Sequence, residues 1–218
     1  MRDPDNIRAA MQLGLDYIGL IFWPKSSRHV KDISTNAGTI PNMPQRLFDD
    51  GTAGKRPAIV GVFVNEMPQT LITHACQYRL DYIQLHGNET PIYIDNLRST
   101  LVPDILPDVK IIKAISIREA DDVKRWREYE GHVDMLLFDT KCESVGGSGQ
   151  QFDWTVLNDY DGNIPFLLSG GIGADDAARV REFHHPMCVG IDLNSRFETA
   201  PALKDISRLR TFIETVRG

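Results

Sequence analysis

Short apolar segments rich in β-branched residues recur at regular intervals along the chain. They occupy residues 17–22, 58–64, 82–86, 110–115, 134–139, 164–169 and 187–192. Because nearly every position in these segments is apolar, both faces of each are expected to be buried, as in parallel strands covered by helices. The pattern therefore predicts seven buried parallel strands.

Amphipathic or charged stretches of helical length separate these strands, among them residues 68–78, 117–129, 175–183 and 205–216. Strand and helix alternate throughout, which indicates an α/β protein with right-handed crossovers. The segment of residues 32–56 fits worst, because Pro and Gly interrupt it repeatedly. A short helix or a loop is expected there.

The first residues carry a helix-start signal. Asp3 can cap the helix, Pro4 suits its first position and Gly14 can end it. The chain also ends with a helical stretch, so seven predicted strands alternate with eight predicted helical segments. A closed barrel of this type has eight strands, each followed by a helix. Residues 1–218 are thus predicted to form one α/β domain, a (β/α)8 TIM barrel that is incomplete, with the eighth strand expected before Met1.

Composition narrows the possible partners. With 24 Lys and Arg against 30 Asp and Glu, the net charge is -6 and no dense basic run is present, so nucleic acid is not an expected partner. The three cysteines, Cys76, Cys142 and Cys188, are far apart and lack metal-ligand spacing, which favours reduced thiols and no metal. The sequence shows neither a membrane span nor a signal peptide, so a cytoplasmic location is expected, with no membrane partner.

Two loops after the last two predicted strands are candidates for binding phosphate. After the sixth strand, Gly170 and Gly171 allow the backbone to approach an anion, and a helix follows. After the seventh, Asn194 and Ser195 can supply the other half of the site. A tight turn explains the glycines alone equally well. The two loops together favour a phosphate site, because barrels of this class bind phosphate there.

Two ionisable residues are expected at the same end of the barrel. Asp139 ends the fifth predicted strand, where a carboxyl group can keep its proton and serve as a general acid, although a capping or ion-paired role is equally compatible. The glycine-rich residues 145–149 after it can move as a lid. Arg28 follows the first strand and can bind a carboxylate, but an Arg in a loop is more often solvated. Arg28 and Asp139 indicate a substrate site only in combination with the two candidate phosphate loops.

Taken in order, these segments closely resemble the phosphoribosylanthranilate isomerases of tryptophan biosynthesis. The matching motifs cover residues 19–28, 60–65, 84–87, 138–140, 146–149, 152–154, 168–171 and 192–195, and hence essentially the whole chain. The resemblance implies an isomerase that converts N-(5-phosphoribosyl)anthranilate to 1-(o-carboxyphenylamino)-1-deoxyribulose 5-phosphate. This Amadori rearrangement uses no cofactor and no metal.

The resemblance also implies roles for individual residues. Asp139 would protonate the ring oxygen and Arg28 would hold the anthranilate carboxylate. The phosphate of the substrate would be bound by backbone groups near Gly170, Gly171, Asn194 and Ser195. Gln84 and His86 end the third predicted strand and either contact the substrate or serve as packed, hydrogen-bonded structural residues.

The beginning of the chain departs from the family pattern. The family opens with a strand ending in Lys-Val-Cys-Gly, whose Cys is the catalytic base, and Met1 matches the next residue. None of the three cysteines aligns with that base, so the expectation is an inactive or impaired isomerase with a start a few residues late. Open strand edges would favour a homodimer or a strand-exchanged oligomer. The alternatives are a non-catalytic phosphosugar-binding barrel and a neighbouring barrel enzyme, such as indole-glycerol-phosphate synthase or a histidine-pathway isomerase.

Overall fold

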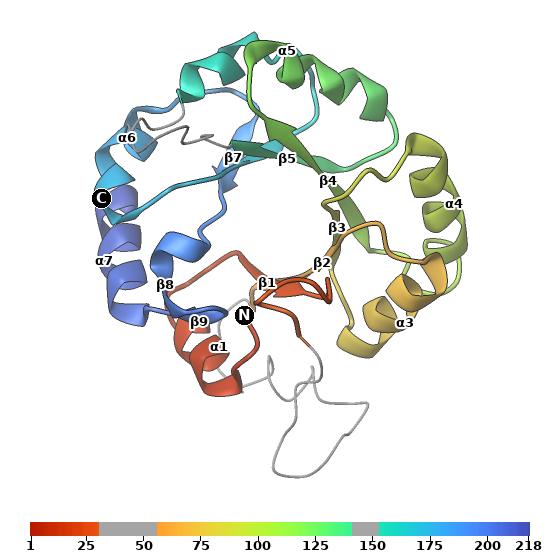
Figure 1. Cartoon of the computed structure of the whole chain (residues 1–218), viewed down its shortest axis with the longest axis horizontal. Helices are drawn as coiled ribbons and strands as arrows, with labels where there is room; N and C mark the ends of the chain where they lie inside the picture. Colours follow the sequence, from red (N-terminus) through yellow and green to blue (C-terminus); the bar gives the residue numbers. More distant parts are fainter. Residues whose placement is uncertain (31–55, 141–152) are drawn as a thin grey trace.

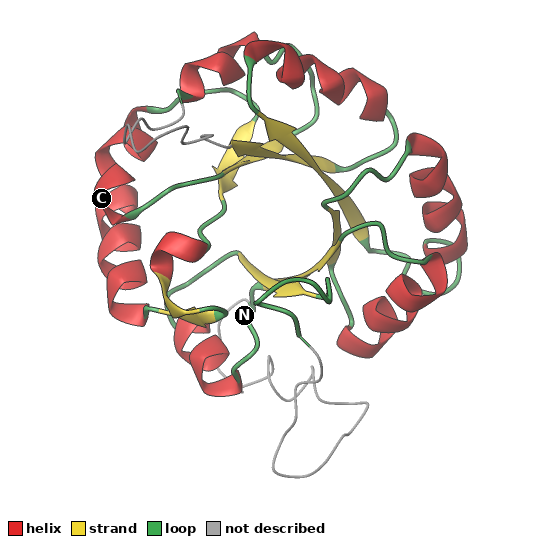
Figure 2. Cartoon of the chain, in the orientation of Figure 1, coloured by secondary structure: helices red, strands yellow, loops and turns green. Residues whose placement is uncertain are grey.

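The computed structural model describes residues 1–30, 56–140 and 153–218 (Figure 1). Within them, seven parallel strands form one sheet in the order of the sequence. The sheet curls into a barrel that is open on one side, and the helices cover its outer side (Figure 2). The predicted incomplete α/β barrel is confirmed. The strands are β1 (Tyr17–Ile21), β2 (Ala58–Phe63), β3 (Tyr82–Leu85), β4 (Lys110–Ile117), β5 (Met135–Thr140), β6 (Phe166–Ser169) and β7 (Cys188–Ile191).

The first helix begins at the capping signal predicted from the sequence. At the first helix, the carboxylate of Asp3 accepts a hydrogen bond from the Asn6 backbone N–H at 2.7 Å, and Gly14 adopts a φ of 67° just beyond its end. No helix in the described part of the chain has the length and apolarity that crossing a membrane requires. The α-helices are α1 (Pro4–Met11), α3 (Pro68–Tyr78), α4 (Pro91–Leu101), α5 (Ala120–Val123), α6 (Ala177–Glu182) and α7 (Ile206–Arg217), and the 3₁₀ helices are η1 (Lys124–Tyr129), η2 (Trp154–Asp159), η3 (Ala174–Asp176) and η4 (Ser195–Phe197).

The predicted start of the helix at residues 117–129 was wrong. Strand β4 continues to Ile117, which pairs with Thr140 of β5. The carboxylate of Asp122 accepts hydrogen bonds from the backbone N–H groups of Arg118 and Glu119, so α5 begins only at Ala120 and passes directly into η1. Of the irregular segment expected at residues 32–56, the structure describes only Arg56. The glycine-rich residues 145–149 and Cys142 also lie outside the described residues.

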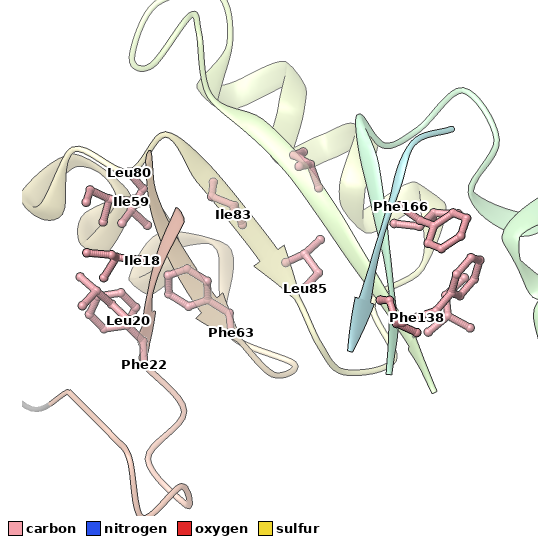
Figure 3. Close-up of a cluster of buried hydrophobic side chains, with 14 of the residues drawn as sticks. Ile18, Leu20, Phe22, Ile59, Phe63, Leu80, Ile83, Leu85, Phe138 and Phe166 are labelled. Atoms are coloured by element: carbon pink, nitrogen blue, oxygen red, sulfur yellow. The ribbon is translucent and has the colours of Figure 1, made fainter. Parts of the chain in front are cut away.

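The structure has two apolar cores, one between the sheet and the helices and one inside the barrel. Side chains that point outward, such as Ile83 and Leu85 of β3, pack under the helices (Figure 3). Side chains of the opposite parity point into the barrel, because successive residues of a strand face opposite sides of the sheet. The inner core consists of Val60, Ile112, Ala114, Met135, Leu137 and Leu167.

The barrel has an open seam between its first and last strands. Among the described residues, β7 pairs only with β6, and β1 has, beyond its ladder with β2, one isolated bridge between Ile21 and His29. A cavity of about 980 Å³ extends along the barrel, with Asn194 and Lys110 among its lining residues, and Leu209 and Phe212 of α7 form part of its wall. The cavity reaches from the interior of the barrel to this seam, with Ile18 of β1 and Gly190 of β7 among its lining residues.

A buried ion pair supports the loop that follows β3. The Lys113 Nζ atom lies 3.1 Å from Oε2 of Glu89, and each side chain is only 2% exposed. The Nζ atom also donates to the carbonyl oxygens of Leu85 and Gly87, at 3.2 and 2.7 Å. Burial lowers the pKa of Lys113, and the charge of Glu89 opposes that shift.

We expect Lys113→Met to destabilise the protein by about 3–5 kcal/mol, because Glu89 would keep its charge in a buried site without its cation. The free energy of unfolding in urea measures this effect. Lys110→Met is the matched control, since Lys110 is exposed at the start of the same strand; its effect should stay within about 0.5 kcal/mol. Equal effects of the two substitutions would contradict the interpretation.

Candidate active site

The residues singled out from the sequence lie along one rim of the barrel, the end where the parallel strands finish. Arg28 lies in the loop after β1, His86 follows β3 and Asp139 lies near the end of β5. Gly170 follows β6 and Asn194 follows β7. Active sites of α/β barrels are built at this end, because the strand-to-helix loops converge there.

Asp139 shares its parity with the inner-core residues of β5, so its carboxyl group points into the mouth of the barrel. Its Oδ2 atom lies 3.4 Å from Nε2 of His86, and Nδ1 of His86 lies 3.0 Å from Nε2 of Gln84. Because the amide nitrogen of Gln84 can only donate, Nδ1 of His86 accepts, and the ring proton of the neutral imidazole is on Nε2. The three side chains therefore form a hydrogen-bonded chain that ends at Asp139.

The loop after β6 packs closely against the end of β5. Gly170 has a φ of 100°, and a Cβ atom there would lie 2.0 Å from the Thr140 carbonyl oxygen, so only glycine fits. Thr140 Oγ1 also donates to the Ser169 carbonyl at 2.7 Å. At Gly171 the space is open, with Arg196 Nη2 at 4.0 Å from the position of a Cβ atom. Gly170 is thus needed for packing, whereas at Gly171, which has a φ of 65°, a Cβ atom would meet no close neighbour.

The loop after β7 lies beside the loop after β6. Ser169 Oγ donates to Oδ2 of Asp192 at 2.8 Å, which links the ends of the two strands. Asn194 and Ser195 are exposed, and Asn194 lines the cavity. The carbonyl oxygen and Oδ1 of Asn194 accept from Lys204 Nζ at 3.0 and 3.1 Å. The Lys204 side chain therefore holds this loop in place.

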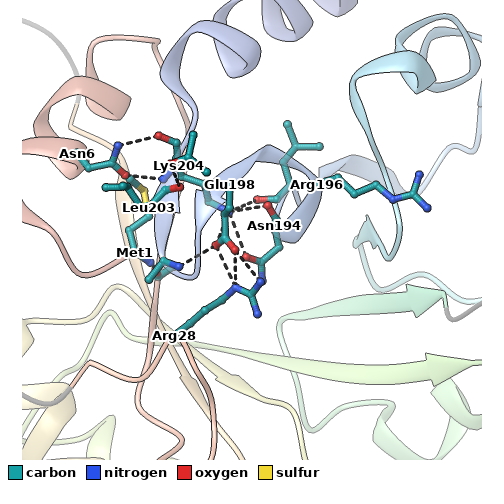
Figure 4. Close-up of polar contacts among 12 residues, drawn as sticks. Met1, Asn6, Arg28, Asn194, Arg196, Glu198, Leu203 and Lys204 are labelled. Atoms are coloured by element: carbon teal, nitrogen blue, oxygen red, sulfur yellow. Dashed lines mark hydrogen bonds and ion pairs between the residues drawn. The ribbon is translucent and has the colours of Figure 1, made fainter.

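Arg28 is paired with a residue that the sequence reasoning missed. Its Nη2 atom lies 2.6 Å from Oε2 of Glu198, whose side chain is 4% exposed (Figure 4). Arg28 itself does not line the cavity. Glu198 belongs to a short hairpin of β8 (Glu198–Ala200) and β9 (Leu203–Lys204). Its turn depends on Ala202 at a φ of 70°, which the residue type does not predict.

The amino group of Met1 lies between β1 and this hairpin. It donates to the Gly19 carbonyl oxygen at 2.6 Å, and Met1 lines the cavity. Burial lowers the pKa of this amine to about 5, with a further contribution from the charge of Lys204 and an opposing one from Glu198.

The fold and this rim define a protein of the (β/α)8-barrel class. A family model described as "PRAI: N-(5'phosphoribosyl)anthranilate (PRA) isomerase" matches residues 1–215. The N-(5'-phosphoribosyl)anthranilate isomerase of Parabacteroides distasonis is 44% identical over 99% of this chain and 90% of that protein. The chain therefore belongs to the phosphoribosylanthranilate isomerase family.

Solved structures show the same fold. A phosphoribosyl anthranilate isomerase in complex with reduced 1-(o-carboxyphenylamino)-1-deoxyribulose 5-phosphate aligns with a TM-score of 0.76 at 24% identity, covering 100% of this chain and 95% of that chain. A structure of monomers generated from the dimeric isomerase of Thermotoga maritima aligns with a TM-score of 0.75, also at 24% identity, and covers the same shares of both chains.

Proposed function

We propose that this protein isomerises N-(5'-phosphoribosyl)anthranilate to 1-(o-carboxyphenylamino)-1-deoxyribulose 5-phosphate in tryptophan biosynthesis. Family membership supports the reaction. The observation that carries the residue assignment is the placement of Asp139, beside His86, on the rim that also holds Arg28 and the loops after β6 and β7. We also propose that the protein is cytoplasmic.

In the proposed reaction, Asp139 is the general acid. It gives its proton to the ring oxygen of the furanose, the ring opens to an imine, and a base then removes the proton from the adjacent sugar carbon. The enol product of that step becomes the ketone. The neighbouring Nε2–H of His86 points at Asp139 and holds its carboxyl group in the mouth of the barrel. No step of this scheme requires a metal or a cofactor.

We assign the two ends of the substrate to different parts of the rim. Arg28 binds the anthranilate carboxylate, since a guanidinium group can form two parallel hydrogen bonds with a carboxylate. The phosphate lies between Gly170 and Gly171 on one side and Asn194 and Ser195 on the other. The open space at Gly171 supports this assignment. Gln84 orients His86.

We further propose that turnover by residues 1–218 alone is slow. Of the cysteines in the described residues, Cys76 is exposed on α3, and Cys188 begins β7 at the end of the barrel opposite the rim. Neither is placed to act as the base. A non-catalytic phosphosugar-binding barrel is the alternative that this observation favours. Because β1 and β7 do not pair with each other in the part of the chain that the structure describes, a homodimer stays a prediction, and sedimentation equilibrium tests it.

Loss of anthranilate fluorescence, with the product identified by nuclear magnetic resonance, tests the proposed function. We expect slow conversion by residues 1–218 and rapid conversion once a Cys-bearing strand precedes Met1. If the extended protein binds the reduced product analogue but converts no substrate, the non-catalytic alternative is correct. If it does neither, the assignment to this substrate is wrong.

A further inference from the structure

The hairpin of β8 and β9 occupies the open side of the rim, between the loop after β1 and the loop after β7. Asn6 of α1 anchors it with two hydrogen bonds of 2.8 Å, one from its side-chain amide to the Lys204 carbonyl and one from the Lys204 N–H to its Oδ1 (Figure 4). Glu198 and Lys204 are directly opposite each other in the antiparallel register. Glu198 is therefore held by the hairpin and by α1, independently of Arg28.

Glu198 binds Arg28 along one edge of the guanidinium group. Its carboxylate accepts from Nε of Arg28 at 2.8 and 3.0 Å and from Nη2 at 2.6 Å. In the described part of the chain, no hydrogen bond from Nη1 is present. A guanidinium group has two edges that can each bind a carboxylate with two hydrogen bonds. The edge that contains Nη1 is left for a second carboxylate, and the Arg28 side chain is 24% exposed.

Glu198 also contacts the cation that holds the loop after β7. Its Oε1 atom lies 3.4 Å from Lys204 Nζ, which donates to the carbonyl oxygens of Leu193 and Asn194 at 3.1 and 3.0 Å. The Lys204 side chain is 9% exposed. The buried carboxylate of Glu198 thus lies between two cations: the guanidinium group of Arg28, in the loop after β1, and the ammonium group of Lys204, which holds the loop after β7.

We propose that Glu198 is a positioning residue that orients Arg28 for the carboxylate of the substrate. The inference rests on the proposed function, because it takes the anthranilate carboxylate as the ligand of Arg28. Glu198 does not touch the substrate. It fixes the plane of the guanidinium group by occupying the edge made by Nε and Nη2, so that a planar carboxylate meets the remaining edge without reorganisation.

A pair of ligands separates this role from a purely structural one. The first is reduced 1-(o-carboxyphenylamino)-1-deoxyribulose 5-phosphate, and the second is its counterpart made with aniline, which lacks the carboxylate. Isothermal titration calorimetry measures the affinity of residues 1–218 for both. The wild-type protein should prefer the carboxylate ligand by at least about 10-fold, which corresponds to one hydrogen bond to a charged group.

Glu198→Ala should remove most of this preference and leave the affinity for the aniline ligand unchanged. Glu198→Gln should keep part of the preference, because its amide oxygen still accepts from Arg28. If the alanine variant does not fold, the glutamine variant still tests the proposal. Glu214→Gln, an exposed carboxylate on α7, is the matched control and should behave like the wild type.

The outcomes distinguish this inference from the proposed function. If the wild-type protein shows no preference for the carboxylate ligand, the role proposed for Arg28 is wrong. If the wild type prefers that ligand and Glu198→Ala retains the full preference, only the positioning role is overturned. Equal weakening of both ligands by Glu198→Ala would also overturn it, because a loss of structure affects both alike.

Discussion

Asp139→Asn is expected to reduce turnover by about 10²–10⁴-fold, the usual size of a general acid contribution, without unfolding the protein. Asparagine has nearly the same shape and still accepts a hydrogen bond from His86, but it has no carboxyl proton to give to the ring oxygen. The rate of anthranilate fluorescence loss measures the effect. The background should be the chain with Lys-Val-Cys-Gly before Met1, so that the unsubstituted rate is high enough to show a large loss.

The control for this prediction is Asp159→Asn, which changes an exposed carboxylate on η2 and should leave the rate unaltered. Binding of the reduced product analogue by Asp139→Asn should persist, because Arg28 and the loops after β6 and β7 are intact. A variant that retains more than a tenth of the original rate would show that Asp139 is not the acid.

Placing Lys-Val-Cys-Gly before Met1 is expected to raise turnover by about 10²–10⁴-fold, since it supplies a thiol base at the rim. The structure provides the space for these residues. Within the described residues, β1 and β7 do not pair with each other, and Met1 already donates to the Gly19 carbonyl of β1. A strand leading to Met1 would pair with both edges and fill part of the cavity.

An extension with Lys-Val-Ala-Gly separates the thiol from the strand. Both extended proteins should have a higher melting temperature than residues 1–218, because strand pairing and apolar burial are common to them. Only the extension with Cys should restore turnover. Equal rates with Ala and Cys would show that closing the seam, and not a new base, limits the reaction.

Much of the fold follows from local patterns in the sequence. The seven strands were predictable because a strand buried on both faces must be apolar at nearly every position. The same reasoning located Asp139, since a carboxyl group at the end of such a strand lies at the rim of the barrel. The start of α1 was predictable as well, because the Asp3 cap and Pro4 act within one turn of the helix.

Contacts between distant segments were not predictable in this way. Nothing near Arg28 in the sequence indicates that its partner is Glu198, 170 positions away. The pairing of His86 with Asp139 likewise spans 53 positions. The end of β4 was misjudged because its last residues are stabilised by pairing with β5, which overrides their local pattern.

The sequence alone determined the class of fold, the order of the strands and the rim on which the candidate residues lie, because these depend on burial patterns that repeat every two or three to four residues. Only the tertiary structure decided how those residues are oriented. The guanidinium group of Arg28 is held by a hairpin from the other end of the chain, and Asp139 is held by His86. Such orientations depend on which segments the closing of the sheet brings together, and a local pattern does not carry that information.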